Sequence, residues 1–307
     1  MKKLVFAYLL ILAASYTCEA QDKDARNYFY NLNPVKQNTV LDSVSNTDIS
    51  FAFSLRKLKQ EYTGWCVQIR RSSDNALQNI GFNGDGLIDT IGLNKFVGGA
   101  QAFVTIWYDQ SGLGRNAVQN TTSQQPLLIK STNKGLPTID FDGSNDILVV
   151  STSMQVLTNS GADGTVFYVG DMDNQADVAW GATGGGFRWY THTSWNNNQV
   201  YFDPGQCCNA PRSFLNTARL DSFDQYTFRR AGTVTQIRMD NVIRMNGTYT
   251  LANFPGTMGF GVGAAFSGIN GVAYSRNKFQ ELIMYRVGVP ATVYSVIELN
   301  QMQFWKI

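Results

Sequence analysis

The sequence is poor in charge, in histidine and in long apolar runs. Charged residues make up 16% of the 307 residues, and 25 Lys and Arg stand against 23 Asp and Glu. This near balance gives no electrostatic reason to expect nucleic acid or an anionic membrane surface as a partner. The single histidine, His192, rules out a histidine-rich zinc site. A Ser-His-Asp hydrolase would have to use His192, and no Gly-x-Ser-x-Gly string accompanies it.

An extended apolar run occurs only near the N-terminus. Lys2 and Lys3 precede residues 4–14, which are apolar, and Cys18-Glu19-Ala20 follows as a small-x-small exit. This pattern predicts a secretory signal over residues 1–20, and no later segment is long enough to span a bilayer. We therefore expect a secreted or cell-surface protein. A lipoprotein anchored through an acylated Cys18 is the alternative.

Cysteine is also scarce. Beyond the predicted signal only Cys66, Cys207 and Cys208 remain, and an odd number means at least one thiol without an intrachain partner. Cys66 lies in an apolar stretch and is predicted to be a buried thiol. Consecutive Cα atoms are ~3.8 Å apart, below the usual disulfide range of about 4.4–6.8 Å. Cys207 and Cys208 are therefore either a strained disulfide or two unlinked thiols in a loop.

Glycine, polar turn residues and short β-branched or aromatic runs are abundant. Apolar spacing predicts helices over residues 51–62, over residues 90–97 and after Pro290. A strand is predicted over residues 103–108. From about residue 125 onward short strands alternate with turn signals, which is typical of an antiparallel sandwich or jelly roll. The predicted strands are 127–129, 138–141, 147–150, 165–169, 187–190, 199–202, 225–230, 235–239, 242–245, 258–262 and 278–285.

Three strings carry a resemblance to a known family: residues 54–58 (Ser-Leu-Arg-Lys-Leu), 70–75 (Arg-Arg-Ser-Ser-Asp-Asn) and 107–112 (Trp-Tyr-Asp-Gln-Ser-Gly). In this order they resemble the front half of the catalytic β-sandwich of fungal-type α-L-arabinofuranosidases. Residues 139–146, 237–241 and 279–285 resemble bacterial laminin-G or concanavalin-like jelly rolls.

The two resemblances imply a mainly β fold. We expect a concanavalin A-like (laminin-G-like) antiparallel β-sandwich or jelly roll over residues 121–307, ending in a C-terminal helix. A small N-terminal α/β extension, residues 21–120, is expected to pack on it. Asp109 and Arg115 are expected to fix a loop through hydrogen bonds.

The sequence departs from the family at the positions of the two catalytic carboxylates. A glycosidase needs two carboxyl groups. The resemblance places a nucleophilic Glu within residues 200–205, Val-Tyr-Phe-Asp-Pro-Gly, which contain no Glu. It places the acid/base Asp after the glycine-rich residues 259–263, where Ala264 stands. We therefore expect an exported carbohydrate-binding or adhesion-type protein that lacks the glycosidase acids.

Two alternatives remain open. The first is an active α-L-arabinofuranosidase-type glycoside hydrolase, with catalytic candidates Glu281, Asp203 and Asp171. The second is a structural cell-surface component that binds assembly partners and no small ligand.

A sugar site needs an aromatic platform and a few hydrogen-bonding groups. In the family, an adjacent-Cys disulfide also packs on the sugar. The candidate glycan-binding residues are Trp189, Tyr190, His192, Trp195, Tyr201, Asp203, Cys207 and Cys208. No cofactor is expected except calcium, for which Asp140, Asp142 and Asp146 are candidate oxygen ligands.

Overall fold

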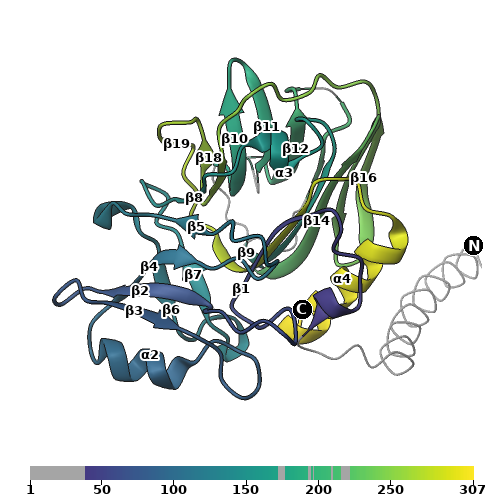
Figure 1. Ribbon diagram of the computed structural model, residues 1–307. Helices are drawn as coiled ribbons and strands as arrows, with labels where there is room; N and C mark the ends of the chain where they lie inside the picture. The colour runs from purple at the N-terminus through teal and green to yellow at the C-terminus, as the bar shows by residue number, and fades with distance from the viewer. Residues whose placement is uncertain (1–38, 172–176, 193–194, 196, 209, 216–221) are drawn as a thin grey trace, which may run out of the picture. The chain divides into compact units, whose positions relative to one another are not determined.

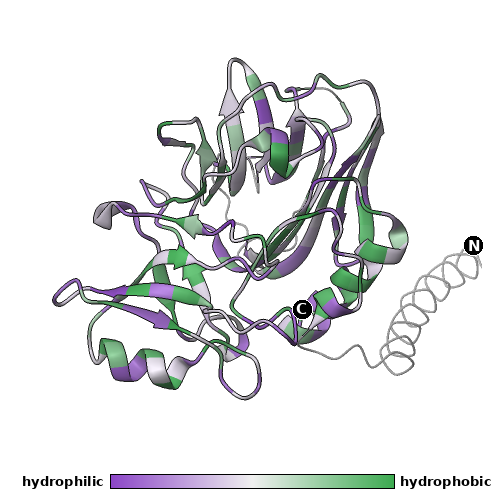
Figure 2. Cartoon of the chain, in the orientation of Figure 1, coloured by the Kyte–Doolittle hydropathy of each residue, from purple (hydrophilic) through white to green (hydrophobic). Residues whose placement is uncertain are grey.

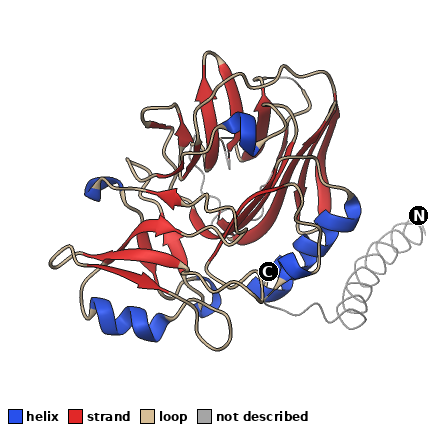
Figure 3. Ribbon diagram, viewed as in Figure 1, coloured by secondary structure: helices blue, strands red, loops and turns tan. Residues whose placement is uncertain are grey.

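The chain folds mainly into β-strands that pair antiparallel (Figure 3). The computed structural model describes residues 39–171, 177–192, 195, 197–208, 210–215 and 222–307. All of them belong to one unit, Asn38–Ile307. The predicted signal and Cys18 lie outside the described residues. In the described part, none of the helices has the length and apolar character needed to cross a membrane.

One layer of the fold is a sheet of six strands joined by antiparallel ladders (Figure 1). We refer to it as layer A. In order across the sheet it consists of β1 (Ile49–Ser54), β20 (Lys278–Tyr285), β9 (Gly164–Asp171), β14 (Phe223–Ala231), β15 (Val234–Met239) and β16 (Val242–Thr248).

The second layer, layer B, is built from shorter strands. It runs through β5 (Ala117–Val118), β8 (Leu148–Val150), β17 (Phe260–Val262), β10 (Trp180–Gly184), β11 (Phe187–His192), β12 (Gln199–Gly205) and β13 (Ser213–Leu215). A small hairpin of β18 (Ala265–Phe266) and β19 (Gly271–Val272) follows β17, and Ala182 of β10 pairs with Phe266.

A third group of strands joins the two layers. β4 pairs with β5 of layer B, and β7 pairs with β20 of layer A. The group comprises β2 (Val67–Arg71), β3 (Leu77–Ile80), β4 (Ala102–Trp107), β6 (Leu127–Ile129) and β7 (Thr138–Asp140), with helix α2 (Thr90–Val97) beside β3. The remaining elements are α3 (Met154–Leu157), α4 (Ala291–Trp305) and the 3-10 turns Val40–Asp42, Thr122–Gln124 and Asn133–Gly135.

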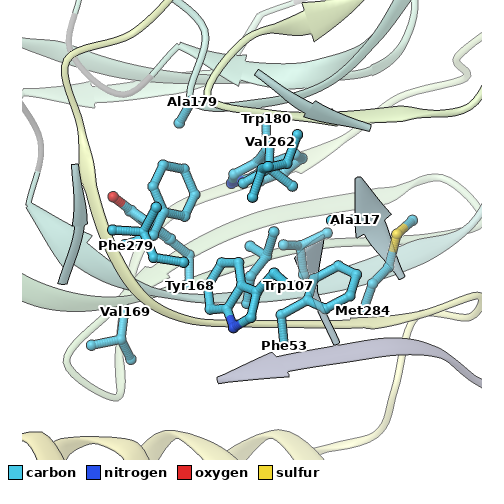
Figure 4. Close-up of a cluster of buried hydrophobic side chains, with 14 of the residues drawn as sticks. Phe53, Trp107, Ala117, Tyr168, Val169, Ala179, Trp180, Val262, Phe279 and Met284 are labelled. Carbon is cyan, nitrogen blue, oxygen red and sulfur yellow. The ribbon is translucent and has the colours of Figure 1, made fainter. Parts of the chain in front are cut away.

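Aromatic side chains from both layers form one apolar core (Figure 4). Trp180 of layer B stacks on Phe260 with ring centroids 5.7 Å apart and meets Phe228 of layer A edge-on at 5.2 Å. Burying a large apolar side chain contributes roughly 1.5–3 kcal/mol, and a well-placed aromatic pair adds about 0.5–1.5 kcal/mol. The hydrophobic residues accordingly run along the strands of both layers (Figure 2).

The Trp-Tyr-Asp-Gln-Ser-Gly string fixes the start of the fold to β1. Trp107 is fully buried and stacks on Phe53 at 5.5 Å. The Asp109 carboxylate accepts hydrogen bonds from the backbone N–H groups of Ala52, Ser111 and Arg115. The predicted loop-fixing role of Asp109 and Arg115 is confirmed, and the string is a structural hub.

One of the three predicted helices differs from the structure. Residues 51–62 do not form a helix, because β1 occupies their first part and pairs with β20 over Ile49–Tyr285 to Ser54–Glu281. All six residues of β1 are buried, on both faces of the strand, so the helical spacing was coincidental. The helices predicted over residues 90–97 and after Pro290 are confirmed as α2 and α4.

Candidate functional site

One row of residues crosses six strands of layer B on a single face. Residues that are directly opposed in antiparallel strands point to the same side of the sheet. The opposed pairs join Val118, Val149, Gly261, Gly181, Tyr190 and Asp203 in that order. The neighbouring positions Trp180 and Trp189 point the other way, into the core. We call the side that carries Tyr190 and Asp203 the site face.

Aromatic rings gather on the site face at the Asp203 end. The Tyr190 ring meets the His192 ring edge-on at 4.8 Å, and the Trp195 ring lies 4.6 Å from His192 on another side. Tyr201 stands across from His192, with its ring centroid 6.2 Å away. Trp195 keeps 39% of its surface exposed, so the cluster reaches solvent through that ring.

The Asp203 carboxylate is paired with a guanidinium group. Nη1 of Arg212 donates to both carboxylate oxygens, at 2.7 and 2.6 Å, and the guanidinium lies 4.4 Å from the Tyr201 ring centroid. The side chain of Asp203 is 1% exposed and that of Arg212 is 21% exposed. Burial raises the pKa of Asp203, and the hydrogen bond from Arg212 opposes that rise.

His192 is held neutral and in one tautomer. Burial is the main reason that its pKa falls to about 4, with the nearby Arg212 and Arg188 acting in the same direction. Its Nδ1 lies 2.8 Å from the backbone oxygen of Asp177. Because a carbonyl oxygen only accepts, Nδ1 carries the proton and Nε2 has the lone pair. The same contact places Asp177, itself buried, beside the site face.

The β18–β19 hairpin lies over the middle of the site face. A Cβ atom on Gly261 would lie 2.4 Å from the Ala264 oxygen and 3.0 Å from the Phe266 nitrogen. The missing side chain at Gly261 therefore lets the hairpin backbone approach the sheet closely. On the Asp203 side, Ala265 packs with Val178 and Tyr190.

Five of the predicted glycan-binding residues, Tyr190, His192, Trp195, Tyr201 and Asp203, come together on the site face. Trp189 does not, because its indole is fully buried in the core and its Nε1 donates to the Ala162 oxygen. Cys207 and Cys208 form a disulfide just beyond the end of β12. Cys66 is the buried free thiol that the sequence predicts.

Glu281 has a structural environment that leaves no room for substrate. It is fully buried, and its carboxylate accepts hydrogen bonds from Ser54, Arg56, Gln301 and Trp305 at 2.6 to 3.0 Å. It ties β1 and α4 to β20, so we interpret it as a fold-stabilising residue and not as a catalytic one.

Asp171 is likewise engaged by another element. At the end of β9 it is 5% exposed, and its carboxylate accepts from the backbone nitrogen and the Nζ of Lys278. Burial raises its pKa, and the Lys278 hydrogen bonds act against that.

Two of the candidate calcium residues, Asp142 and Asp146, lie in one turn, whereas Asp140 ends β7 with its carboxylate 3.8 Å from Nζ of Lys278. Oδ1 of Asp142 accepts from the backbone N–H groups of Ser144, Asn145 and Asp146 at 2.8, 3.1 and 3.3 Å. Burial, followed by the charge of Asp142, raises the pKa of Asp146 to about 7. Within the described ranges, no three His, Cys, Asp or Glu side chains are grouped so that they could hold a metal ion.

Comparison with known proteins decides the family. The model of the catalytic domain of alpha-L-arabinofuranosidase B matches residues 41–216, more than half of the chain. The chain belongs to the arabinofuranosidase B catalytic-domain family. The prediction of a binding protein without glycosidase acids is therefore wrong, because the matched family is defined by a catalytic domain and not by a lectin.

Solved structures agree on the fold of this arabinofuranosidase B family chain. An arabinofuranosidase complexed with arabinofuranosyl-α-1,2-xylobiose superposes with a TM-score of 0.64 at 17% identity, over 88% of this chain and 65% of its own. A GH54 α-L-arabinofuranosidase soaked with a cyclic sulfate inhibitor gives 0.61 at 18% identity, over 84% of this chain and 63% of its own. The chain thus spans less than two thirds of either protein. No curated protein matches the sequence.

Three residues of the site face were missed at the sequence level: Arg188, Arg212 and Asp177. Arg188 could have been predicted from the sequence. It precedes Tyr190 and His192 by two and four positions on β11 and so shares their face. Arg212 reaches Asp203 only through the β12–β13 register, and Asp177 only through a backbone contact. Neither contact leaves a local pattern in the sequence.

Proposed function

We propose that this chain is a glycoside hydrolase domain that releases α-L-arabinofuranosyl groups from a neutral glycan. The observation that carries the proposal is the match of residues 41–216 to an arabinofuranosidase catalytic domain. The site face supports it, because a buried carboxylate lies beside a cluster of aromatic rings at the end of the sheet. Aromatic rings that face a sugar ring, with a few polar groups for its hydroxyls, form a typical glycan site.

We assign to Asp203 the role of the nucleophile that attacks the anomeric carbon of the arabinofuranosyl group. It occupies the strand in which the family resemblance places a nucleophilic Glu, and it points to the site face beside Tyr190. Hydrolysis then needs a second carboxyl group to protonate the departing glycosidic oxygen. We assign this role to Asp177, whose backbone oxygen lies 2.8 Å from Nδ1 of His192 and whose carboxylate accepts from the backbone nitrogen of Arg276 at 3.4 Å. The position where the resemblance places the acid/base, Ala264, carries no ionisable group.

Arg212 controls access to Asp203 in this proposal. It is the more exposed member of the ion pair, and its guanidinium lies against Tyr201. The sugar must take the place of the guanidinium for Asp203 to reach the anomeric carbon. Arg212 would then be free to donate hydrogen bonds to sugar hydroxyls.

The test is a panel of 4-nitrophenyl glycosides. We expect release of 4-nitrophenol from the α-L-arabinofuranoside and at least about a hundredfold less from the β-D-xylopyranoside, the α-L-arabinopyranoside and the β-D-galactopyranoside. Equal rates on all four, or turnover of a pyranoside alone, would contradict the sugar assignment. NMR of the first-formed anomer gives the stereochemistry, which reports the separation of the two carboxyl groups.

Asp177 has its own test within the same assay. A better leaving group needs less help from a proton donor, so Asp177→Asn should slow cleavage of an alkyl arabinofuranoside much more than cleavage of the 4-nitrophenyl one. The matched control is Asp163→Asn, on the loop before β9. Equal losses on both substrates would remove Asp177 from the proton-donor role.

We also propose that the two layers belong to the concanavalin A-like class and that the protein is exported. The antiparallel layers with an aromatic core between them support the first point. The basic and apolar pattern of residues 1–20 supports the second. Mass spectrometry of the mature N-terminus distinguishes cleavage before Gln21 from an acylated Cys18.

A further inference from the structure

Apart from the cluster around Asp203, the site face carries a pocket on the far side of the β18–β19 hairpin, which we call the second pocket. It encloses about 620 Å³, which is within the size range of small-molecule sites. Val118 and Val149 in its floor belong to the same six-strand row as Tyr190 and Asp203. Phe266, Ile269, Asn270 and Gly271 of the hairpin form a wall. The hairpin therefore divides one sheet face into two places where a ligand can lie.

The lining combines amide and hydroxyl groups with apolar side chains. No residue that lines this pocket carries a charge, and the polar members bear amide or hydroxyl groups. The complete lining consists of Val118, Gln119, Asn120, Thr121, Gln124, Ile147, Val149, Ser151, Phe266, Ile269, Asn270 and Gly271. Amides hydrogen-bond to hydroxyl groups as donor and acceptor, and aliphatic side chains with one aromatic ring suit the C–H face of a sugar.

The side-chain amide of Gln119 is held in place by hydrogen bonds within the protein. The Gln119 amide donates to Oε1 of Gln124 at 3.2 Å and to the Ile147 oxygen at 3.0 Å. The backbone nitrogen of Thr121 donates to Oε1 of Gln119 at 2.9 Å. The Gln119 side chain therefore needs no further ordering when a ligand binds, which favours affinity. At the rim, Ile269 is 86% exposed, and such an apolar side chain on a loop tip is well placed to contact a ligand.

We infer that this pocket binds a segment of neutral oligosaccharide, the chain that bears the arabinofuranosyl group cleaved at Asp203. The inference rests on the proposed function for the identity of the glycan, and on the pocket alone for its being neutral and rich in hydroxyls. An anionic glycan is disfavoured, because no cation lines the pocket to offset its desolvation.

The first test is binding without catalysis. Xylohexaose and arabinohexaose are titrated into the ¹⁵N-labelled full chain, and the side-chain amide signals of Gln124 and Asn270 are followed. Saturable shifts of these signals are expected with at least one of the two sugars. Ser151→Trp, which places an indole at an exposed lining position, should weaken binding at least fivefold, and Ile269→Asp should also weaken it. The matched control is Ile91→Asp, on helix α2, where the isoleucine is 80% exposed.

The second test separates this inference from the proposed function. Ser151→Trp should leave kcat/KM on 4-nitrophenyl α-L-arabinofuranoside unchanged and reduce it at least fivefold on a polymeric arabinoxylan. A wild-type chain that cleaves the aryl substrate while both oligosaccharides leave the amide signals unmoved overturns the pocket and spares the enzyme. Saturable amide shifts in a chain that cleaves nothing overturn the enzyme and spare the pocket.

Discussion

At the scale of single residues, the site depends on the pairing of the buried Asp203 carboxyl group with the Arg212 guanidinium. Burial alone raises the pKa of this carboxyl group, and the hydrogen bonds from Arg212 bring it back toward the ordinary range. The proposed nucleophile thus depends on a residue that also covers it. A single arginine therefore influences both the charge state of the site and its accessibility.

Replacing Arg212 should move the acid limb of the pH–rate profile. Without the guanidinium the pKa of Asp203 rises further, so the carboxylate is lost at a higher pH. In Arg212→Gln, kcat/KM on 4-nitrophenyl α-L-arabinofuranoside should therefore begin to fall at a higher pH than in the wild type. Arg244→Gln, on the exposed face of β16, is the control and should keep the wild-type profile. An unchanged acid limb in Arg212→Gln would mean that Asp203 does not act as the ionised group.

Glu281 should matter for stability and not for chemistry. Glu281→Gln leaves the buried Arg56 without its counter-charge, and breaking a buried pair in this way costs about 3 kcal/mol or more. Urea denaturation should show that loss in the free energy of unfolding, while kcat per folded molecule stays within about twofold of the wild type. The control is Asp74→Asn in the exposed Arg71–Asp74 pair, which should change little. A folded Glu281→Gln protein without activity would return Glu281 to the list of catalytic candidates.

At the scale of elements, the β18–β19 hairpin is the piece that shapes the site face. It packs on Tyr190 through Ala265 and walls the second pocket through Phe266. Its position depends on the absence of a side chain at Gly261 of β17. The predicted strand over residues 258–262 included this glycine, but local sequence gave no sign of the hairpin that rests on it.

Gly261→Ala should displace the hairpin and disturb both halves of the site face. A methyl group 2.4 Å from the Ala264 oxygen forces the backbone to shift, at a cost of about 1–3 kcal/mol. We expect a lower melting temperature by calorimetry together with reduced activity on the aryl arabinofuranoside. Gly84→Ala is the matched control, since a Cβ there meets nothing within 4 Å. If Gly261→Ala matches the wild type in both measurements, the hairpin does not shape the site.

At the scale of the whole molecule, the sequence predicted the strand-rich antiparallel character and both α2 and α4, because those signals are local. It failed at β1, since a strand buried on both faces shows no alternation that distinguishes it from a helix. Site residues, too, were predictable only where their signal is local. Tyr190 and His192 were found from one hairpin, whereas Arg212 and Asp177 depend on strand register and on a contact across a loop.

Because the chain matches a catalytic-domain family, the main question about the molecule is which residues catalyse the reaction. Absent residues at two aligned positions led to the expectation of a non-catalytic protein. The missing Glu was given more weight than Asp203, which the alternative hypothesis named as a catalytic candidate and which lies on the face beside the aromatic cluster. The two layers hold that face rigidly, because Trp180 and Phe260 anchor its strands in the common core.

The most direct test of the central claim is the rate of 4-nitrophenol release from 4-nitrophenyl α-L-arabinofuranoside by the wild type and by Asp203→Asn. We expect steady turnover by the wild type and a rate at least about a hundredfold lower for Asp203→Asn. The variant should show an unchanged circular dichroism spectrum. A wild type without turnover, or a folded Asp203→Asn protein as fast as the wild type, would contradict this claim.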